Sequence, residues 1–205
     1  MAEDNLNRTA TGEGATFLST ARVIGDLLDM LDAGKVAEAA ETYSLCQEDV
    51  GYVLIHKTKQ NGRLHKQLAN MFFKARDFEK AALCCENMKE YGKAAQLYDQ
   101  ADDYQTAAEM YVKEGNLEKA AEMFERNQNY RQAAELFVKV KNFSRAAANY
   151  EKAVDYFLAG KLYHELGKFR KSVELLQKVR ADEDNFLEAT LLIGNILASH
   201  NASLA

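Results

Sequence analysis

Four histidines, three cysteines and many carboxylates are the residues of this sequence that could bind a metal or take part in catalysis. The histidines, His56, His65, His164 and His200, are scattered, and no two of them have the short spacing that metal sites use. The carboxylates fall beside Lys or Arg at helical spacing, which favours a solvated face over paired catalytic acids. The sequence contains no glycine-rich phosphate loop and no nucleophile elbow. We therefore expect no enzyme, no metal and no cofactor.

The cysteines, Cys46, Cys84 and Cys85, favour a reducing compartment. They are odd in number, and the adjacent pair would point about 100° apart on a helix, which is poor disulfide geometry. Buried, unreactive thiols are favoured over a reactive cysteine, because Cys84 and Cys85 fall at core positions of the repeat described next. With no signal segment visible, these features predict a cytoplasmic protein. No apolar run approaches the roughly 20 residues that span a bilayer, so we expect no membrane insertion.

A repeat of 13 residues positions some of these side chains, among them Cys84, Cys85 and His164. It runs from Arg76 to Val179, eight times without a gap, in units such as GNLEKAAEMFERN. Each unit opens with two turn-type residues and places an aromatic residue or leucine third, two small residues (mostly alanines) sixth and seventh, and mostly an aromatic residue tenth. Offsets of three, four and seven residues lie on one face of a helix. The pattern predicts a stack of short helices, which are too short to be stable alone and must support their neighbours.

The whole sequence divides into a polar N-terminal segment and one repeat region that ends in an apolar helix. Residues 1–14 are polar and without period, and predict a flexible N-terminal tail. Residues 15–199 predict one helical-repeat solenoid, in which the repeats are clear over 63–179. A final helix with unusually apolar sequence is expected over 185–199.

Successive units differ, so the full repeat is a pair of helices, 26 residues long. The even units carry a basic residue at position five: Lys93, Lys119, Arg145 and Lys171. The odd units carry apolar residues at nominally outward positions: Leu83, Val112, Val138 and Phe157. The basic stripe could meet an acidic partner or RNA, but pairing with nearby acids of the same helix is the simpler interpretation. The net charge of −5, with acids and bases interspersed, makes nucleic acid an improbable partner.

The string GNLEKAAEMF (Gly115 to Phe124) resembles the second helix of a tetratricopeptide repeat, and the preceding unit resembles its first helix. The pair here has 26 residues, whereas that family has about 34 and uses a Trp and a Pro that this chain lacks. Shortened pairs of this kind are also similar to stretches of clathrin heavy chain and of intraflagellar transport proteins. The resemblance implies an all-α solenoid of short antiparallel helix pairs, TPR-like, with 13 residues per helix.

In the tetratricopeptide family the first helices line a concave groove that holds peptides or partner helices. Carried over by position, the resemblance implies a groove lined by residues of the odd units: Leu83, Glu109, Val112, Glu135, Val138, Phe157, Lys161 and His164. The expected function is a non-enzymatic interaction module, a scaffold or adaptor, that binds a peptide or helix of a partner protein. Scattered exposure of single apolar residues is the alternative explanation of the same pattern.

The final helix supports a second hypothesis, a self-associating structural or assembly protein. Apolar residues leave this helix without a polar face, and helices that are apolar on every side are normally buried. The helix would then dock back on the solenoid or form a homo-oligomer contact through Phe186, Leu187, Leu191, Leu192 and Ile196.

Overall fold

The computed structural model describes residues 7–46 and 49–202, and within these ranges every regular element is an α-helix. The helices are α1 (Asn7–Asp32), α2 (Val36–Ser44), α3 (Gly51–Thr58), α4 (Gly62–Lys74), α5 (Phe78–Asn87), α6 (Tyr91–Gln100), α7 (Tyr104–Glu114), α8 (Leu117–Arg126), α9 (Tyr130–Lys139), α10 (Phe143–Lys152), α11 (Tyr156–Glu165), α12 (Phe169–Leu176) and α13 (Phe186–Ala202). The predicted all-α solenoid of short helix pairs is confirmed.

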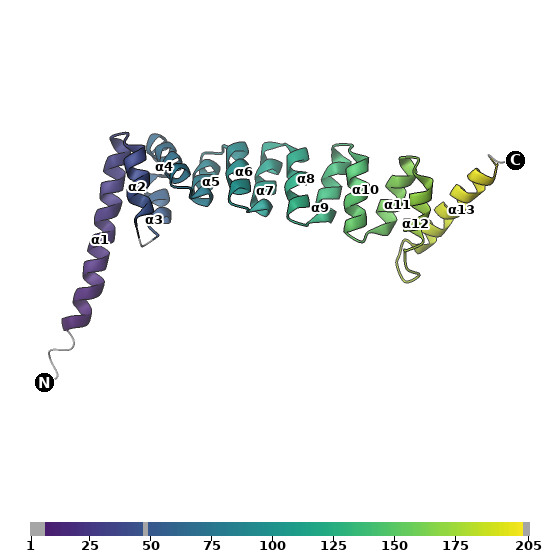
Figure 1. The fold of residues 1–205 in the computed structure, drawn as a ribbon, viewed down its shortest axis with the longest axis horizontal. Coiled ribbons are helices and arrows are strands. Elements are labelled where there is room, and N and C mark those ends of the chain that lie inside the picture. The colour runs from purple at the N-terminus through teal and green to yellow at the C-terminus, as the bar shows by residue number, and fades with distance from the viewer. Residues whose placement is uncertain (1–6, 47–48, 203–205) are drawn as a thin grey trace. The chain divides into compact units, whose positions relative to one another are not determined.

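The chain divides into two units, Met1–Asp103 and Tyr104–Ala205. In the first unit α4, α5 and α6 pack in succession, and α2 packs on both α1 and α4. In the second unit each helix from α7 to α12 packs on the next one along the chain, as Figure 1 shows. The continuity of one solenoid over 15–199 stays a prediction.

One turn recurs at the first residue of every 13-residue unit. The backbone φ angle is positive, between 58° and 89°, at eight such positions: Arg76, Lys89, Asp102, Gly115, Gln128, Lys141, Val154 and Gly167. At Gly115 the N–H donates to the carbonyl of Val112 (3.0 Å), and the N–H of Asn116 donates to the carbonyl of Tyr111 (2.9 Å). These two bonds form a Schellman motif, which ends one helix and lets the next begin two residues later.

In several units the second residue caps the helix that follows with its side chain. The side chains of Asp77, Asn116, Asn142 and Asp155 each accept a hydrogen bond from the backbone N–H three residues later. This bond satisfies one of the donors that a helix N-terminus leaves without a partner. The turn-type residues recognised in the sequence therefore stop one helix and start another.

The predicted small pair of each unit lies in the core. Most of the alanines at positions six and seven, such as Ala120 and Ala121, are fully buried, and residues at position ten such as Phe124 are nearly so. Gly160 takes the place of the second alanine in α11, and a Cβ there would lie 2.7 Å from Leu176 in α12. The backbone carbonyl of Gly160 also accepts a hydrogen bond from the Ser172 hydroxyl (2.8 Å), so α11 and α12 approach closely at this point.

The helix ends differ from the expected ones outside the repeat. α1 begins at Asn7, within the segment 1–14 for which we expect a tail; residues 1–6 lie outside the described part of the chain, and tail flexibility stays a prediction. The final helix covers Phe186–Ala202, close to the expected 185–199.

Val154 is expected to destabilise the fold through its backbone conformation. It is a β-branched residue at φ 62° and is 64% exposed, so its side chain packs little. Because Asn tolerates this left-handed region far better, Val154→Asn should raise the free energy of unfolding by about 1 kcal/mol in urea titrations. Val154→Thr keeps the branched Cβ and is the matched control. An equal gain in both variants would mean that side-chain polarity, and not backbone strain, is responsible.

Candidate protein-interaction surfaces

The odd helices of the second unit present a surface of alternating apolar and acidic side chains. On α7, Val112 is 42% exposed and Glu109 is exposed one turn earlier. On α9, Val138 and Glu135 occupy the same positions, with Val138 half-buried and Glu135 exposed. We call these four residues the odd-helix face.

One of the residues predicted to line the groove lies in the core. Phe157 on α11 is only 5% exposed and packs in a cluster with Leu176, Val179 and Ile196. It was expected to point outward because of its position in the repeat, but α13 lies outside the repeat and covers it. Phe157 is therefore not part of any open groove.

The remaining predicted groove residues have local partners. Lys161 donates a hydrogen bond to Glu188 of α13 (3.0 Å) and lies over the ring of Phe157. The ring of His164 packs against Phe169 with centroids 5.5 Å apart. Leu83 lies in the first unit, half-buried against the core of that unit. Their role in binding stays a prediction.

The basic stripe on the even helices is engaged in ion pairs. Arg145 of α10 binds Glu122 and Glu125 of α8, each at 2.8 Å. Lys171 of α12 binds Glu151 of α10 at the same distance. Each pair joins helices that are two apart in the chain. The result is a series of ion pairs along the even helices α8, α10 and α12, which we call the ion-pair ladder. The stripe therefore pairs with acids, but Arg145 does so between helices and not within its own helix as expected, whereas Lys171 also pairs with Glu174 of its own helix (3.3 Å).

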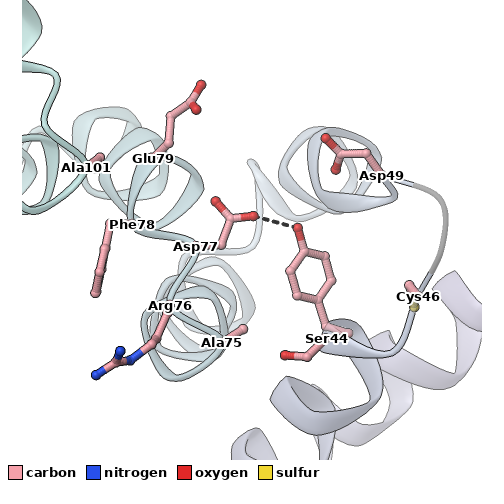
Figure 2. A pocket seen from close by; sticks show the side chains of 10 residues that line it. Ser44, Cys46, Asp49, Ala75, Arg76, Asp77, Phe78, Glu79 and Ala101 are labelled. Carbon is pink, nitrogen blue, oxygen red and sulfur yellow. Dashed lines mark hydrogen bonds between the residues drawn. The ribbon is translucent and has the colours of Figure 1, made fainter.

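A cavity of about 620 Å³ opens in the first unit, between the end of α2 and the start of α5. At its wall the hydroxyl of Tyr43 donates to the carboxylate of Asp77 (2.7 Å), the dashed bond in Figure 2. Lys80 binds Asp77 at 2.9 Å and Asp49 at 3.2 Å. Sequence analysis missed this arrangement, because Tyr43 and Asp77 are 34 residues apart and nothing in the repeat pairs them.

The electrostatics of this cavity hold Asp77 ionised. Burial opposes ionisation, but hydrogen bonds from Lys80 and Tyr43 bring the pKa of Asp77 below its usual value. Burial and the bond to Asp77 raise the pKa of Tyr43, so its phenol stays protonated. Two of the acids that line the cavity, Asp49 and Asp77, are therefore paired with Lys80.

The final helix packs on one side only. Ile196 is 5% exposed and Leu192 is partly buried, both against the cluster around Phe157, so these two predicted oligomer contacts serve the core instead. The other three, Phe186, Leu187 and Leu191, are exposed. A groove of about 920 Å³ separates the start of α12 from the end of α13, with apolar residues such as Leu197 in its wall.

Cys84, Cys85 and His65 are buried. Burial raises the pKa of the Cys84 thiol to about 12, and all three cysteines are free. The ring of His65 is buried and shares a hydrogen bond with the Thr58 hydroxyl (2.8 Å), and burial lowers its pKa. The side chain of His200 lies outside the described part of the chain. Within residues 7–46 and 49–202 no group of three His, Cys, Asp or Glu could hold a metal ion.

Comparison with known families identifies a family that shares this repeat. A family model described as "Region in Clathrin and VPS" matches residues 24–162. The chain belongs to this family. No curated protein matches the chain. The clathrin and VPS repeat is a helical scaffold-type module, so the coarse expectation of a helical-repeat scaffold is confirmed, while the specific likeness to tetratricopeptide repeats is not.

The match to the clathrin and VPS family covers the odd-helix face and the cavity beside Asp77. It ends within α11, so α12 and α13 lie beyond the matched residues.

None of the helices in the described ranges has the length and apolar character needed to cross a membrane.

The charge of Asp77 should stabilise the first unit in a pH-dependent way. Its folded-state pKa is lowered, so the stabilisation is complete above the unfolded-state pKa of about 4 and is lost as the pH falls through the folded-state value. Asp77→Asn keeps the helix cap and removes the charge. It should lower the free energy of unfolding by about 1 kcal/mol at neutral pH, and by much less in acid.

Urea titrations across this pH range provide the measurement. Asp29→Asn, the same change at an exposed carboxylate of the first unit, is the control and should have little effect at any pH. If Asp77→Asn lowered the free energy of unfolding by the same amount at neutral and at acidic pH, the proposed role of the Asp77 charge would be wrong.

Proposed function

We propose that this chain is a non-enzymatic protein-interaction module and that the odd-helix face binds an amphipathic helix or extended peptide of a partner protein. The observation that carries the proposal is the difference between the two kinds of helix in the second unit. At position eleven the odd helices α7 and α9 expose Val112 and partly expose Val138. The even helices α8 and α10 have Glu125 and Glu151 there, and both are engaged in the ion-pair ladder.

The side chains of the odd-helix face suggest the chemistry of the partner. The two valines would take apolar side chains, while Glu109 and Glu135 are exposed one turn away and would favour Lys or Arg beside them. Val112 and Val138 are one 26-residue pair apart, so a peptide lying across α7 and α9 would meet the same pair of groups twice. Such a partner is a basic amphipathic segment.

Three further observations are consistent with the proposal. The ladder occupies Arg145 and Lys171 with internal carboxylates, which leaves less positive surface for nucleic acid. Free cysteines with raised pKa values fit a reducing compartment such as the cytoplasm. The clathrin and VPS repeat, as a scaffold-type module, is consistent with binding through helical surfaces.

Selection of a phage-displayed peptide library on the intact chain tests the proposal. The selected peptides should share apolar residues at helical spacing together with Lys or Arg. Val112→Asp should weaken their binding at least about tenfold, because it places a charge where an apolar side chain docks. Val53→Asp is the matched control, since Val53 is a helical valine of the first unit with 43% exposure.

Two outcomes would contradict the odd-helix face as the site. One is equal loss of binding in both variants. The other is a large fall in the melting temperature of Val112→Asp, which would show that this valine is a core residue.

A further inference from the structure

The outer side of α13 carries an unpartnered stripe of apolar and small residues. Leu187 is 69% exposed and Leu191 is 60% exposed. Gly194 and Ala198 follow at intervals of three and four residues and are also exposed. These four residues, which we call the α13 stripe, lie on one side of the helix, opposite the buried side with Ala189 and Ile196. Spacings of four, three and four residues are those of a helix–helix seam.

The order of large and small residues along the stripe is self-complementary. Two leucines occupy its first half, and glycine and alanine occupy its second half. When a second such helix runs antiparallel, Leu187 of each copy lies opposite Ala198 of the other, and Leu191 lies opposite Gly194. Each large side chain then meets a small one, and a Cβ built on Gly194 has nothing within 4 Å in its own chain, so this position is open for a leucine to fill.

Charge along α13 favours the same arrangement. Three exposed acidic residues, Asp182, Glu183 and Asp184, lie just before the helix; Asp182 pairs with Arg180, and the segment 180–184 keeps a net negative charge. At the opposite end of α13, the groove beside Ile196 and Leu197 is lined by Lys168 and Arg170, and also by Lys171 and Glu174, which pair with each other. In an antiparallel pair the acidic end of each copy approaches the basic rim of the other. A parallel pair would instead bring the two acidic ends together, which is unfavourable.

We propose that α13 binds the α13 of a second copy of this chain, antiparallel and about a twofold axis that passes between Leu191 and Gly194. A twofold axis makes the two halves of the contact identical, which matches the self-complementary order of the stripe. Phe186 and Leu197, which are also exposed at the two ends of the helix, extend the apolar contact on the side of the basic groove. The odd-helix face takes no part, so this dimer is independent of the peptide-binding proposal.

Light scattering of the intact chain tests the existence of the dimer. The molar mass in solution should be twice the chain mass of 23.0 kDa. Gly194→Leu fills the position that receives Leu191 of the other copy and should raise the dimer dissociation constant at least about tenfold. Its melting temperature in the monomeric state should not fall, because that position is open and leucine favours a helix more than glycine does. Asn195→Leu, the same substitution at the next, exposed residue, is the control and should leave the dimer intact.

Disulfide trapping tests the antiparallel register. Two differently tagged chains, one with Leu187→Cys and one with Ala198→Cys, are prepared on a Cys46→Ser background and mixed under mild oxidation. They should cross-link to each other, whereas Leu187→Cys alone should not. Cross-linking of Leu187→Cys to itself would show a parallel pair and overturn the proposal. A monomeric intact chain, or a dimer that Gly194→Leu leaves unchanged, would also overturn it, since the stripe would then serve another partner.

Discussion

The left-handed residue at the start of each 13-residue unit is the constraint on which the rest of the structure depends. It allows two backbone hydrogen bonds to close each helix within two residues, so every helix of the repeat begins at the third residue of its unit and most end at the twelfth. This fixed starting point keeps positions six, seven and ten on the same side of each helix. Small residues therefore meet at each close approach, and larger apolar residues such as Phe124 and Phe137 fill the remaining space. Six of these eight turns adopt this conformation without glycine, so the packing of the helices stabilises backbone conformations that their own residues disfavour.

The same regularity separates the two faces of the second unit. Because side chains recur in register, a carboxylate on α8 or α10 meets a cation on the helix after next. Arg145 shows how tightly one such cation is held: it binds two glutamates and also lies 4.2 Å from the ring centroid of Phe137. Partly exposed ion pairs contribute little to the free energy of folding, but they occupy charged side chains of the even helices. The odd helices α7 and α9 have valines at the corresponding place, and these valines belong to the face that we propose as the binding site.

Sequence periodicity predicted the parts of the fold that depend on local pattern. Helices α5 to α12 could be placed closely from the repeat, because turn, cap and core residues recur at fixed positions. The burial of Phe157 could not be predicted, since it depends on α13, which follows the non-repeating segment 180–185. The bond between Tyr43 and Asp77 was missed for a similar reason, because it joins an irregular segment to the repeat. Residues 7–14 lack apolar periodicity, so the first turns of α1 had no signal in the sequence.

The ladder of ion pairs also limits how a chain of this design can change its length. Each rung joins a helix to the one two places along, as Glu151 and Lys171 do. An insertion or loss of a single 13-residue unit would exchange odd and even helices beyond that point, and cations would then meet valines instead of carboxylates. Gain or loss of 26 residues would preserve every rung and both faces. Duplication and deletion in such an array are therefore tolerated in whole helix pairs, so that the array can lengthen while each added pair repeats the same two surfaces.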